Sequence, residues 1–314
     1  MYFPILRGRQ FELLALRECV NNGILSDFLI PIVEPVKVSS TFTKTLDSFV
    51  DHKHPIGVIR NPVVGKWSRE IVKTSNQKIQ KHYTELLDNK YLIETFYVTP
   101  DLGSNGVLWE NRILQFEKSI LICNQPEYIE HYEHITSGIS PLYNIIPDRA
   151  DFRRSIRANR VMCEDHFPKQ SRNIDYSGID TEFFSADHLY YKEDGYKGFS
   201  DYSVVGSEYS ETGFAPYAVA IHIVYFDDNN KLRIAHFVSD SNDDISDPAR
   251  KFGEAVEKLV QWNKIMKLNT MGIKAFEDTY KNGTYPGLGV AKKYSIMHLS
   301  LIHISEPTRH SLIS

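Results

Sequence analysis

The sequence contains few cysteines and no long hydrophobic run. Its 314 residues include only 3 cysteines, and none of them stands in a Cys-x-x-Cys pair. An odd number of widely spaced cysteines does not fit a disulfide framework and favours a reducing compartment. No stretch reaches the roughly 18 consecutive apolar residues of a membrane-spanning helix, and the N-terminus lacks the pattern of a signal peptide. We therefore expect a cytoplasmic protein with no membrane partner.

Neither sign of charge is in large excess. The 36 basic and 40 acidic residues give a formal net charge of −4, and the isoelectric point is about 6.3. A protein that coats nucleic acid usually has a strongly basic face, so bulk nucleic-acid binding is not expected. Hydrophobic residues make up 42% of the chain and charged residues 24%. This composition excludes a disordered chain and provides for a large core.

The last residues have an unusual sequence. The run from Leu299 to Arg309 can be back-translated into the transposase mosaic end and adapter of sequencing libraries. We therefore expect residues 299–314 to be an adapter-derived tail. On this interpretation, residues 1–298 form a single barrel-like domain whose natural C-terminal continuation is missing.

Short apolar runs alternate with amphipathic segments along most of the chain. Residues 29–33 are nearly all apolar, as in a strand that is buried on both faces. After Ser40, the residues Phe42, Leu46 and Phe49 share one face of a predicted helix. The repetition of strand and helix predicts a parallel sheet with helices outside it. The predicted strands are 3–6, 29–33, 56–59, 93–98, 119–123, 142–146, 161–163 and 202–205.

Eight such strands predict an α/β fold, a parallel (β/α)8 barrel in one domain. Two further apolar runs, 218–226 and 232–238, flank a turn sequence and predict a β-hairpin insertion near the C-terminal end. The segment 167–200 shows no clear helical period. Predicted helices include 68–89, 107–116, 248–260 and 270–281.

Polar residues follow most of the predicted strands. Ligands of parallel barrels bind at the C-terminal ends of the strands, where side chains converge. Glu34 is the leading catalytic candidate because it directly follows a buried run, where an unpaired charge is costly. Asp148 and Asp201 are the other predicted catalytic residues. With Glu34 and Glu164 they could form an oxygen site for a divalent metal such as Mg²⁺ or Ca²⁺, or supply an acid and base pair.

The expected ligand-binding residues also lie near strand ends or in a glycine-rich segment, 195–208, that could approach a ligand. Three arginines among them could clamp a phosphate or a carboxylate. The same charges could instead neutralise one another as structural ion pairs, and the glycine-rich segment could simply allow close packing of backbones. The predicted ligand-binding residues are Arg7, Lys37, Arg60, Asn124, Arg149, Glu164 and Glu208.

A weaker signal lies near the C-terminus. Gly287-Leu-Gly289 with Lys292 and Lys293 has some features of a phosphate-binding loop. No suitable strand precedes this segment, so it is a poor match to such a loop.

The chain resembles the phage beta-protein family in four segments that are spread over most of its length. They are the run from Tyr2 to Arg17, Pro31-Ile-Val-Glu-Pro-Val-Lys37, Gly198-Phe-Ser-Asp-Tyr202 and Gly287-Leu-Gly289. The resemblance implies a phage or bacterial setting and carries no activity with it. Its segments contain four residues that the strand ends also indicate, namely Arg7, Glu34, Lys37 and Asp201.

These patterns predict a strand-end pocket that binds or hydrolyses a phosphorylated or nucleotide-like ligand. A metal-dependent hydrolase is one form of this prediction, and whether the protein is an enzyme stays open. The alternative is a non-catalytic interaction protein that binds a partner protein through the barrel mouth or the hairpin. The enzyme hypothesis predicts that Glu34, Asp148 and Asp201 converge in one pocket, and their separation would contradict it.

Overall fold

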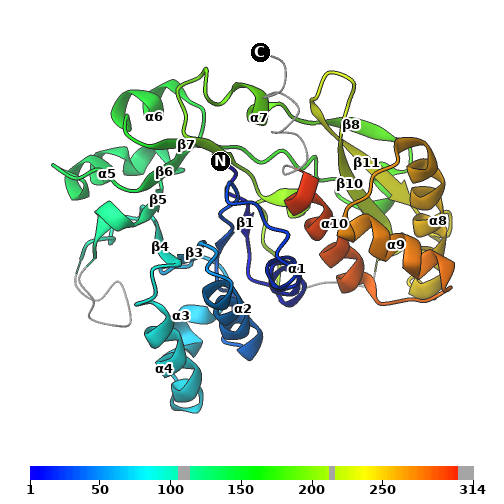
Figure 1. Ribbon diagram of the computed structural model, residues 1–314, viewed down its shortest axis with the longest axis horizontal. Helices are drawn as coiled ribbons and strands as arrows, with labels where there is room; N and C mark the ends of the chain where they lie inside the picture. The colour runs from blue at the N-terminus through cyan, green and yellow to red at the C-terminus, as the bar shows by residue number, and fades with distance from the viewer. Residues whose placement is uncertain (105–113, 212–215, 303–314) are drawn as a thin grey trace.

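The chain folds into a parallel barrel joined to a small antiparallel sheet (Figure 1). The computed structural model describes residues 1–104, 114–211 and 216–302. Eight parallel strands follow one another in the order β1-β2-β3-β4-β5-β6-β7-β9. Their bounds are β1 (Ile5–Leu6), β2 (Ile32–Val33), β3 (Ile56–Ile59), β4 (Leu92–Tyr97), β5 (Ile120–Ile122), β6 (Tyr143–Ile146), β7 (Arg160–Cys163) and β9 (Gly198–Ser200).

The two edges of this sheet meet, so the barrel is nearly closed. Tyr2 forms parallel bridges to both Leu29 and Phe199. The N–H of Phe3 donates to the carbonyl of Phe199 at 2.9 Å, and that of Ile5 donates to the carbonyl of Asp201 at 2.8 Å. The predicted α/β barrel is thereby confirmed.

Alternation along the strands separates the barrel interior from the helix layer. Ile5, Ile32 and Ile59 belong to the cluster that fills the interior, whereas their neighbours Leu6, Val33 and Val58 pack outward. Gly57 allows the dense packing, because an added Cβ would lie 2.9 Å from the side chains of Ile32 and Thr95.

Helices cover the outside of the barrel. Helix α2 begins at Ser40, and its N-terminus is capped by the hydroxyl of Ser39, which accepts from the N–H of Phe42 at 3.3 Å. The ring of Phe42 packs against Trp67 and Tyr83 of the following helices. The barrel helices are α1 (Gln10–Asn21), α2 (Ser40–Asp51), α3 (Trp67–Glu70), α4 (Gln77–Leu86), α5 (Ile129–Ile135) and α6 (Ala150–Ser155).

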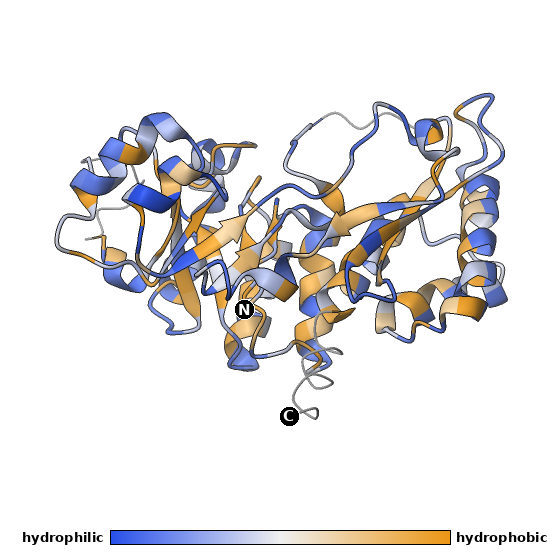
Figure 2. Cartoon of the chain, turned by 90° about the horizontal axis from the view of Figure 1, so that it is seen from above, coloured by the Kyte–Doolittle hydropathy of each residue, from blue (hydrophilic) through white to orange (hydrophobic). Residues whose placement is uncertain are grey.

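The predicted hairpin is present and forms part of a three-stranded antiparallel sheet. Strands β10 (Ala220–Phe226) and β11 (Leu232–Val238) form the hairpin, and β8 (Thr181–Ser185) pairs with β11. Helices α8 (Pro248–Met266) and α9 (Met271–Lys281) pack on one face of this sheet. In Figure 2 the strands are largely hydrophobic, and the outer helices are hydrophilic on their exposed sides.

Helix α10 (Leu288–Ile302) connects the barrel and the small sheet, with contacts to α1, α9 and β10. It carries the buried side chains of Ile296, Met297, Leu299 and Ile302. Its last turn, 299–302, falls in the expected adapter tail, and residues 303–314 lie outside the described part of the chain. None of the helices in the described ranges has the length and apolar character needed to cross a bilayer.

Two predicted elements are wrong. The eighth barrel strand is β9 at 198–200, not 202–205, because the chain turns at Ser203, which has φ +56° and donates its N–H to the Asp201 carboxylate. Residues 203–205 form a 3-10 turn. The long helix 68–89 is broken between α3 and α4, where Thr74-Ser-Asn76 favours a turn over a continuous helix. Most of the predicted helix 107–116 lies outside the described residues.

Candidate functional site

The best candidate for catalysis, Glu34, lies in an ion pair inside the barrel. Because Ile5 and Ile32 point inward, Arg7 and Glu34, two residues further along their strands, also point inward. The Arg7 guanidinium donates through Nη1 to the carboxylate of Glu34. Glu34 is fully buried, and Arg7 is 8% exposed. The two residues close the C-terminal end of the barrel interior.

Both oxygens of Glu34 are engaged. Oε2 accepts from Arg7 and from the Tyr97 hydroxyl at 3.0 Å, while Oε1 accepts from the N–H groups of Val63 and Val64 at 2.8 and 3.2 Å. Burial, together with the negative charge of Glu34, raises the pKa of Tyr97. A carboxylate with four donors is well suited to holding loops together and poorly placed to exchange a proton with a ligand.

Arg7 is covered by the chain that follows β9. Its Nη2 donates to the carbonyl of Ser207, and its guanidinium lies 5.3 Å from the ring centre of Tyr202. Arg9 extends the cover, with a hydrogen bond to the Ser210 carbonyl at 2.7 Å. Of the three guanidinium nitrogens of Arg7, Nε alone has no hydrogen-bond partner among the described residues. The segment 206–211 therefore closes this end of the barrel.

Asp148 and Glu164 form a second, more exposed group. The backbone N–H of Asp148 donates to Glu164 Oε1 at 3.1 Å. The Asp148 carboxylate accepts from Arg153 and from the Tyr196 hydroxyl. Burial opposes ionisation of Asp148, but these two hydrogen bonds and the charge of Arg153 lower its pKa below the usual value. Asp148 and Glu164 thus have hydrogen-bond partners within this group, which lies on the outer side of the barrel wall.

Asp201 lies apart from both the Arg7–Glu34 ion pair and the Asp148–Glu164 group. It follows β9 on the side opposite to Tyr202, and it accepts from the Tyr2 hydroxyl at 2.8 Å and the Ser203 N–H at 2.7 Å. Burial raises the pKa of Asp201 to about 6, although the charge of His166 and these hydrogen bonds act in the other direction. Glu34, Asp148 and Asp201 share no hydrogen-bond partner among the described residues, so the expected convergence is not seen there.

The other predicted ligand-binding residues are also separated. Arg60 points outward, because Ile59 points inward, and it pairs with Glu94 and lies 5.9 Å from the ring centre of Tyr83. Arg149 pairs with Asp151 at 2.6 Å, and Glu208 pairs with Lys169 at 2.5 Å. Lys37 and Asn124 are exposed.

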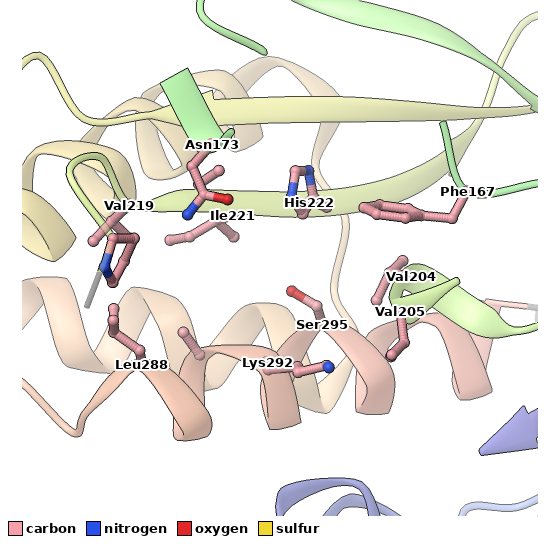
Figure 3. Close-up of a pocket in the computed structure, with 13 residues that line it drawn as sticks. Phe167, Asn173, Val204, Val205, Val219, Ile221, His222, Leu288, Lys292 and Ser295 are labelled. Atoms are coloured by element: carbon pink, nitrogen blue, oxygen red, sulfur yellow. The ribbon is translucent and has the colours of Figure 1, made fainter. Parts of the chain in front are cut away.

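A pocket of about 280 Å³ lies beside the barrel end, between the loops after β7 and β9, strand β10 and helix α10 (Figure 3). Its walls are mostly apolar, and Lys292 and Ser295 face His222 across it. Val204 and Val205 bring the end of the barrel into its lining. The remaining lining residues are Phe167, Asn173, Pro216, Val219, Ala220, Ile221, Leu288 and Ala291.

Lys292 connects this pocket to the barrel end. Its Nζ lies 3.6 Å from Oε1 of Glu12, a side chain only 1% exposed. Oε2 of Glu12 accepts from the backbone N–H of Arg7 at 2.7 Å. Burial lowers the pKa of Lys292; the carboxylate of Glu12 opposes this change, and the positive charges of Arg9 and Lys169 add to it. The pocket therefore combines one lysine, which stands beside a buried carboxylate, with mostly apolar walls.

His222, which lines the pocket, contacts a second histidine, His236. Nδ1 of His222 lies 2.7 Å from Nδ1 of His236, whose Nε2 lies 3.0 Å from Glu182 Oε1. This chain of contacts needs one Nδ1 to donate and the other to accept, as in two neutral rings. Burial lowers the pKa of His222 to about 3, and electrostatic effects of His236 and Lys292 act in the same direction. His222 is thus a neutral polar group in the pocket.

A metal site is not evident in this part of the molecule. Across residues 1–104, 114–211 and 216–302, no group of three or more His, Cys, Asp or Glu side chains could hold a metal ion. The carboxylates that the sequence suggested as Mg²⁺ ligands are distributed over the three separate groups described above. The residues present therefore do not fit the expected divalent metal.

Sequence reasoning missed the residues that the pocket brings together. Glu12, His222 and Lys292 come from α1, β10 and α10, and no local pattern connects them. The nearest signal was the pair Lys292-Lys293 after Gly287-Leu-Gly289, which has some features of a phosphate loop but is a poor match to one, and a helix forms there.

No protein-family model matches this sequence, and no curated protein matches it. The resemblance to the phage beta-protein family therefore stays a prediction.

Proposed function

We propose that the pocket beside the barrel end binds a small phosphorylated or nucleotide-like ligand. The observation that carries this proposal is the position of Lys292, a cation in an otherwise mostly apolar pocket whose ion-pair partner, Glu12, lies 3.6 Å away. The positive charges of Arg9 and Lys169 also act on Lys292. An anionic group beside Lys292 would be attracted by these three charges and repelled by the carboxylate of Glu12. The attraction is stronger because the site is partly shielded from water.

The walls suit the remainder of such a ligand. A volume of about 280 Å³ is near the lower limit of roughly 300 Å³ for ligand pockets. It favours a small phosphorylated molecule over a dinucleotide. The rings of Phe167 and His222 lie 5.1 Å apart and offer an aromatic wall for a flat group.

Two observations favour binding over metal-dependent hydrolysis. Glu34 has all its acceptor positions occupied by protein donors, and it shares no partner with Asp148 or Asp201 among the described residues. We propose a cytoplasmic, phage or bacterial setting, on the basis of the family resemblance and three thiols that are free of disulfides.

The experiment is a thermal-shift and calorimetric titration with AMP, ribose 5-phosphate and inorganic phosphate, with adenosine as the uncharged control. Saturating ligand at 100 times its Kd stabilises a protein by about 2.7 kcal/mol. We expect this effect with the phosphorylated compounds and not with adenosine. It should disappear in Lys292→Met and persist in Lys293→Met, because Lys293 is bound to Glu18 at 2.6 Å.

Equal shifts in wild type and Lys292→Met, or no shift with any phosphorylated compound, would contradict the proposal. Far-ultraviolet circular dichroism of each variant shows whether it has folded.

A specific observation also favours the interaction protein as a second candidate. Strand β8 is an edge of the small sheet, and its Phe183 is 54% exposed. An exposed edge strand with a large apolar side chain can accept a strand from a partner. Sedimentation of the purified chain, alone and with candidate partners, tests this function. Complex formation that Phe183→Lys abolishes and Lys292→Met leaves intact would support it.

A further inference from the structure

We propose that Lys292 is a nucleophilic amine that forms a Schiff base with a small phosphorylated aldehyde or ketone in the pocket. The inference rests on the proposed function, because it names the ligand class and the chemistry of the same site. It follows from the position of one amine, from the carboxylate beside it and from the contrast with neighbouring lysines.

Lys292 lines the pocket, whose walls are otherwise mostly apolar, and its side chain is 33% exposed. Figure 3 shows Lys292 on α10, with its side chain directed toward the loop carrying Val204 and Val205. Its salt-bridge partner is Glu12, at 3.6 Å, which is longer than a hydrogen bond. A carbonyl compound that enters the pocket can therefore approach the amine.

Other lysines of the same region are held by close partners. Lys293 donates to Glu18 at 2.6 Å. Lys251, whose side chain is almost fully buried, donates to the Asp244 carbonyl at 2.5 Å, and Lys258 donates to the Val238 carbonyl at 2.7 Å. An amine needs a free electron pair to attack a carbonyl, and a tightly hydrogen-bonded ammonium does not have one. Of these four lysines, Lys292 is the best placed to attack a carbonyl carbon.

Its surroundings also make loss of the ammonium proton easier than for an exposed lysine. Burial lowers the pKa of Lys292, and the charges of Arg9 and Lys169 support that direction against the effect of Glu12. Desolvation and neighbouring cations are the means by which proteins activate lysine as a nucleophile. The same cations would attract a phosphate group on the ligand.

Glu12 is placed to move the protons. Its Oε2 is fixed by the N–H of Arg7 at 2.7 Å, whereas Oε1, which faces Lys292, accepts no hydrogen bond from the described residues. Such an oxygen can take a proton from the attacking amine and return it to the departing oxygen.

The reaction needs no oxidant or metal. The electron pair of Nζ forms a bond to the carbonyl carbon, and the π electrons of the C=O bond move to oxygen. Transfer of a proton from nitrogen to oxygen, through Glu12, gives the carbinolamine. The nitrogen electron pair then forms the C=N bond as the C–O bond breaks, and the oxygen leaves as water with the remaining proton of the nitrogen, again transferred through Glu12.

The test uses glycolaldehyde phosphate with sodium cyanoborohydride, which reduces the imine to a stable secondary amine. Peptide mapping by mass spectrometry then locates the added mass on the full chain. We expect at least about tenfold more adduct on Lys292 than on Lys293, its neighbour in the sequence. We also expect loss of this adduct in Lys292→Arg, and at least about tenfold slower labelling in Glu12→Gln, in line with a general acid and base.

The matched compound 2-hydroxyethyl phosphate lacks the aldehyde and separates the two proposals. Binding of this compound without a Lys292 adduct from the aldehyde would overturn the Schiff base and leave ligand binding intact. Absence of both binding and adduct would overturn both proposals. Two further outcomes would overturn the assignment of Lys292. One is labelling that is spread evenly over the surface lysines, and the other is a total amount of adduct that stays the same in Lys292→Arg. Lys292→Arg keeps the charge beside Glu12, so it tests reactivity without leaving a buried carboxylate unpaired.

Discussion

Arg7 and Glu34 are 27 residues apart in sequence, and their side chains form a buried ion pair where the first two barrel strands end. The same carboxylate also holds the loop after β3 through Val63 and Val64, and the end of β4 through Tyr97. Four successive strand ends are thus tied to one side chain. This arrangement favours an architectural role for Glu34 over a catalytic one.

The architectural role predicts a large loss of stability when one partner is removed. In Glu34→Leu, the guanidinium of Arg7 stays buried without its counter-charge, so we expect a loss of about 3–5 kcal/mol in the free energy of unfolding. Urea denaturation followed by circular dichroism measures this loss. The double variant Arg7→Met/Glu34→Leu should lose less than the sum of its two single variants, because the pair is coupled.

A catalytic role for Glu34 would give the opposite pattern. Glu34→Gln would then fold with nearly unchanged stability, while any turnover of a phosphorylated substrate would vanish.

The buried Asp201 predicts a pH dependence of stability with a definite sign. Burial raises its pKa from 3.8 to about 6, so the folded state holds the proton more tightly than the unfolded state. The stabilising contribution is complete below the unfolded pKa and is lost as the pH rises through about 6. Between about pH 4 and about pH 8, Asp201→Asn should therefore gain on the order of 3 kcal/mol relative to wild type.

Asp148→Asn is the matched control for that series. The pKa of Asp148 is lowered in the folded protein, so its stabilising contribution is present at high pH and is lost as the pH falls. This variant should lose stability relative to wild type as the pH rises. Parallel pH profiles for Asp201→Asn and wild type would show that the Asp201 carboxyl does not titrate as its burial predicts.

The barrel was predictable because buried parallel strands leave apolar runs in the sequence. Strands β3 and β6 fall within or directly on the predicted runs. Strand β9 was misplaced because Val204 and Val205 look strand-like, although the chain has already turned at Ser203. Helix α10 was missed because it is apolar on most sides and gives little helical period.

The candidate site was less predictable, because strand ends do not reveal which side of the wall a residue faces. Glu34 and Asp201 both follow strands, yet one points into the barrel and the other away from it. Alternation with Ile32 already places Glu34 inside, whereas the side of Asp201 depends on the true position of β9. The approach of Lys292 to Glu12 joins residues that are 280 positions apart (292 − 12), and no local pattern predicts it.

The crossing of α9 and α10 predicts that Gly272 cannot be enlarged. A Cβ at this position would collide with the carbonyl oxygen of Tyr294 and lie 2.8 Å from the backbone nitrogen of His298. Because these atoms belong to the backbone of a helix, the two helices would have to separate. We expect Gly272→Ala to cost about 1–3 kcal/mol in thermal or urea unfolding.

Gly253 on α8 is the control for this substitution. An added Cβ there would have no heavy atom within 4 Å, so Gly253→Ala should stabilise the protein by about 0.5–1 kcal/mol through helix propensity. Similar effects of the two substitutions would mean that α9 and α10 do not pack as closely as described.

His298 predicts a loss of stability in mild acid. It lies on α10, where Nδ1 is 2.7 Å from the hydroxyl of Thr270 and Nε2 is 2.5 Å from the carbonyl of Val224, so it joins α9 and β10. Burial lowers its pKa from 6.5 to about 4. The folded state thus binds the proton less tightly than the unfolded state. The stabilising contribution of the neutral His298 is complete above the unfolded pKa of 6.5. It is lost as the pH falls from 6.5 to about 4, and the loss is on the order of 3 kcal/mol.

Urea denaturation at several pH values between about pH 7 and about pH 4 measures this slope. His298→Gln lowers stability at every pH, because it disturbs both contacts, but it should remove most of the slope that His298 causes. Since Asp201 acts in the opposite direction over part of this range, the comparison is best made in the Asp201→Asn background. His52 lies exposed just after α2, so His52→Gln should leave the slope unchanged. A slope that persists in His298→Gln would assign the acid sensitivity to other groups, with the buried His222 as the next to replace.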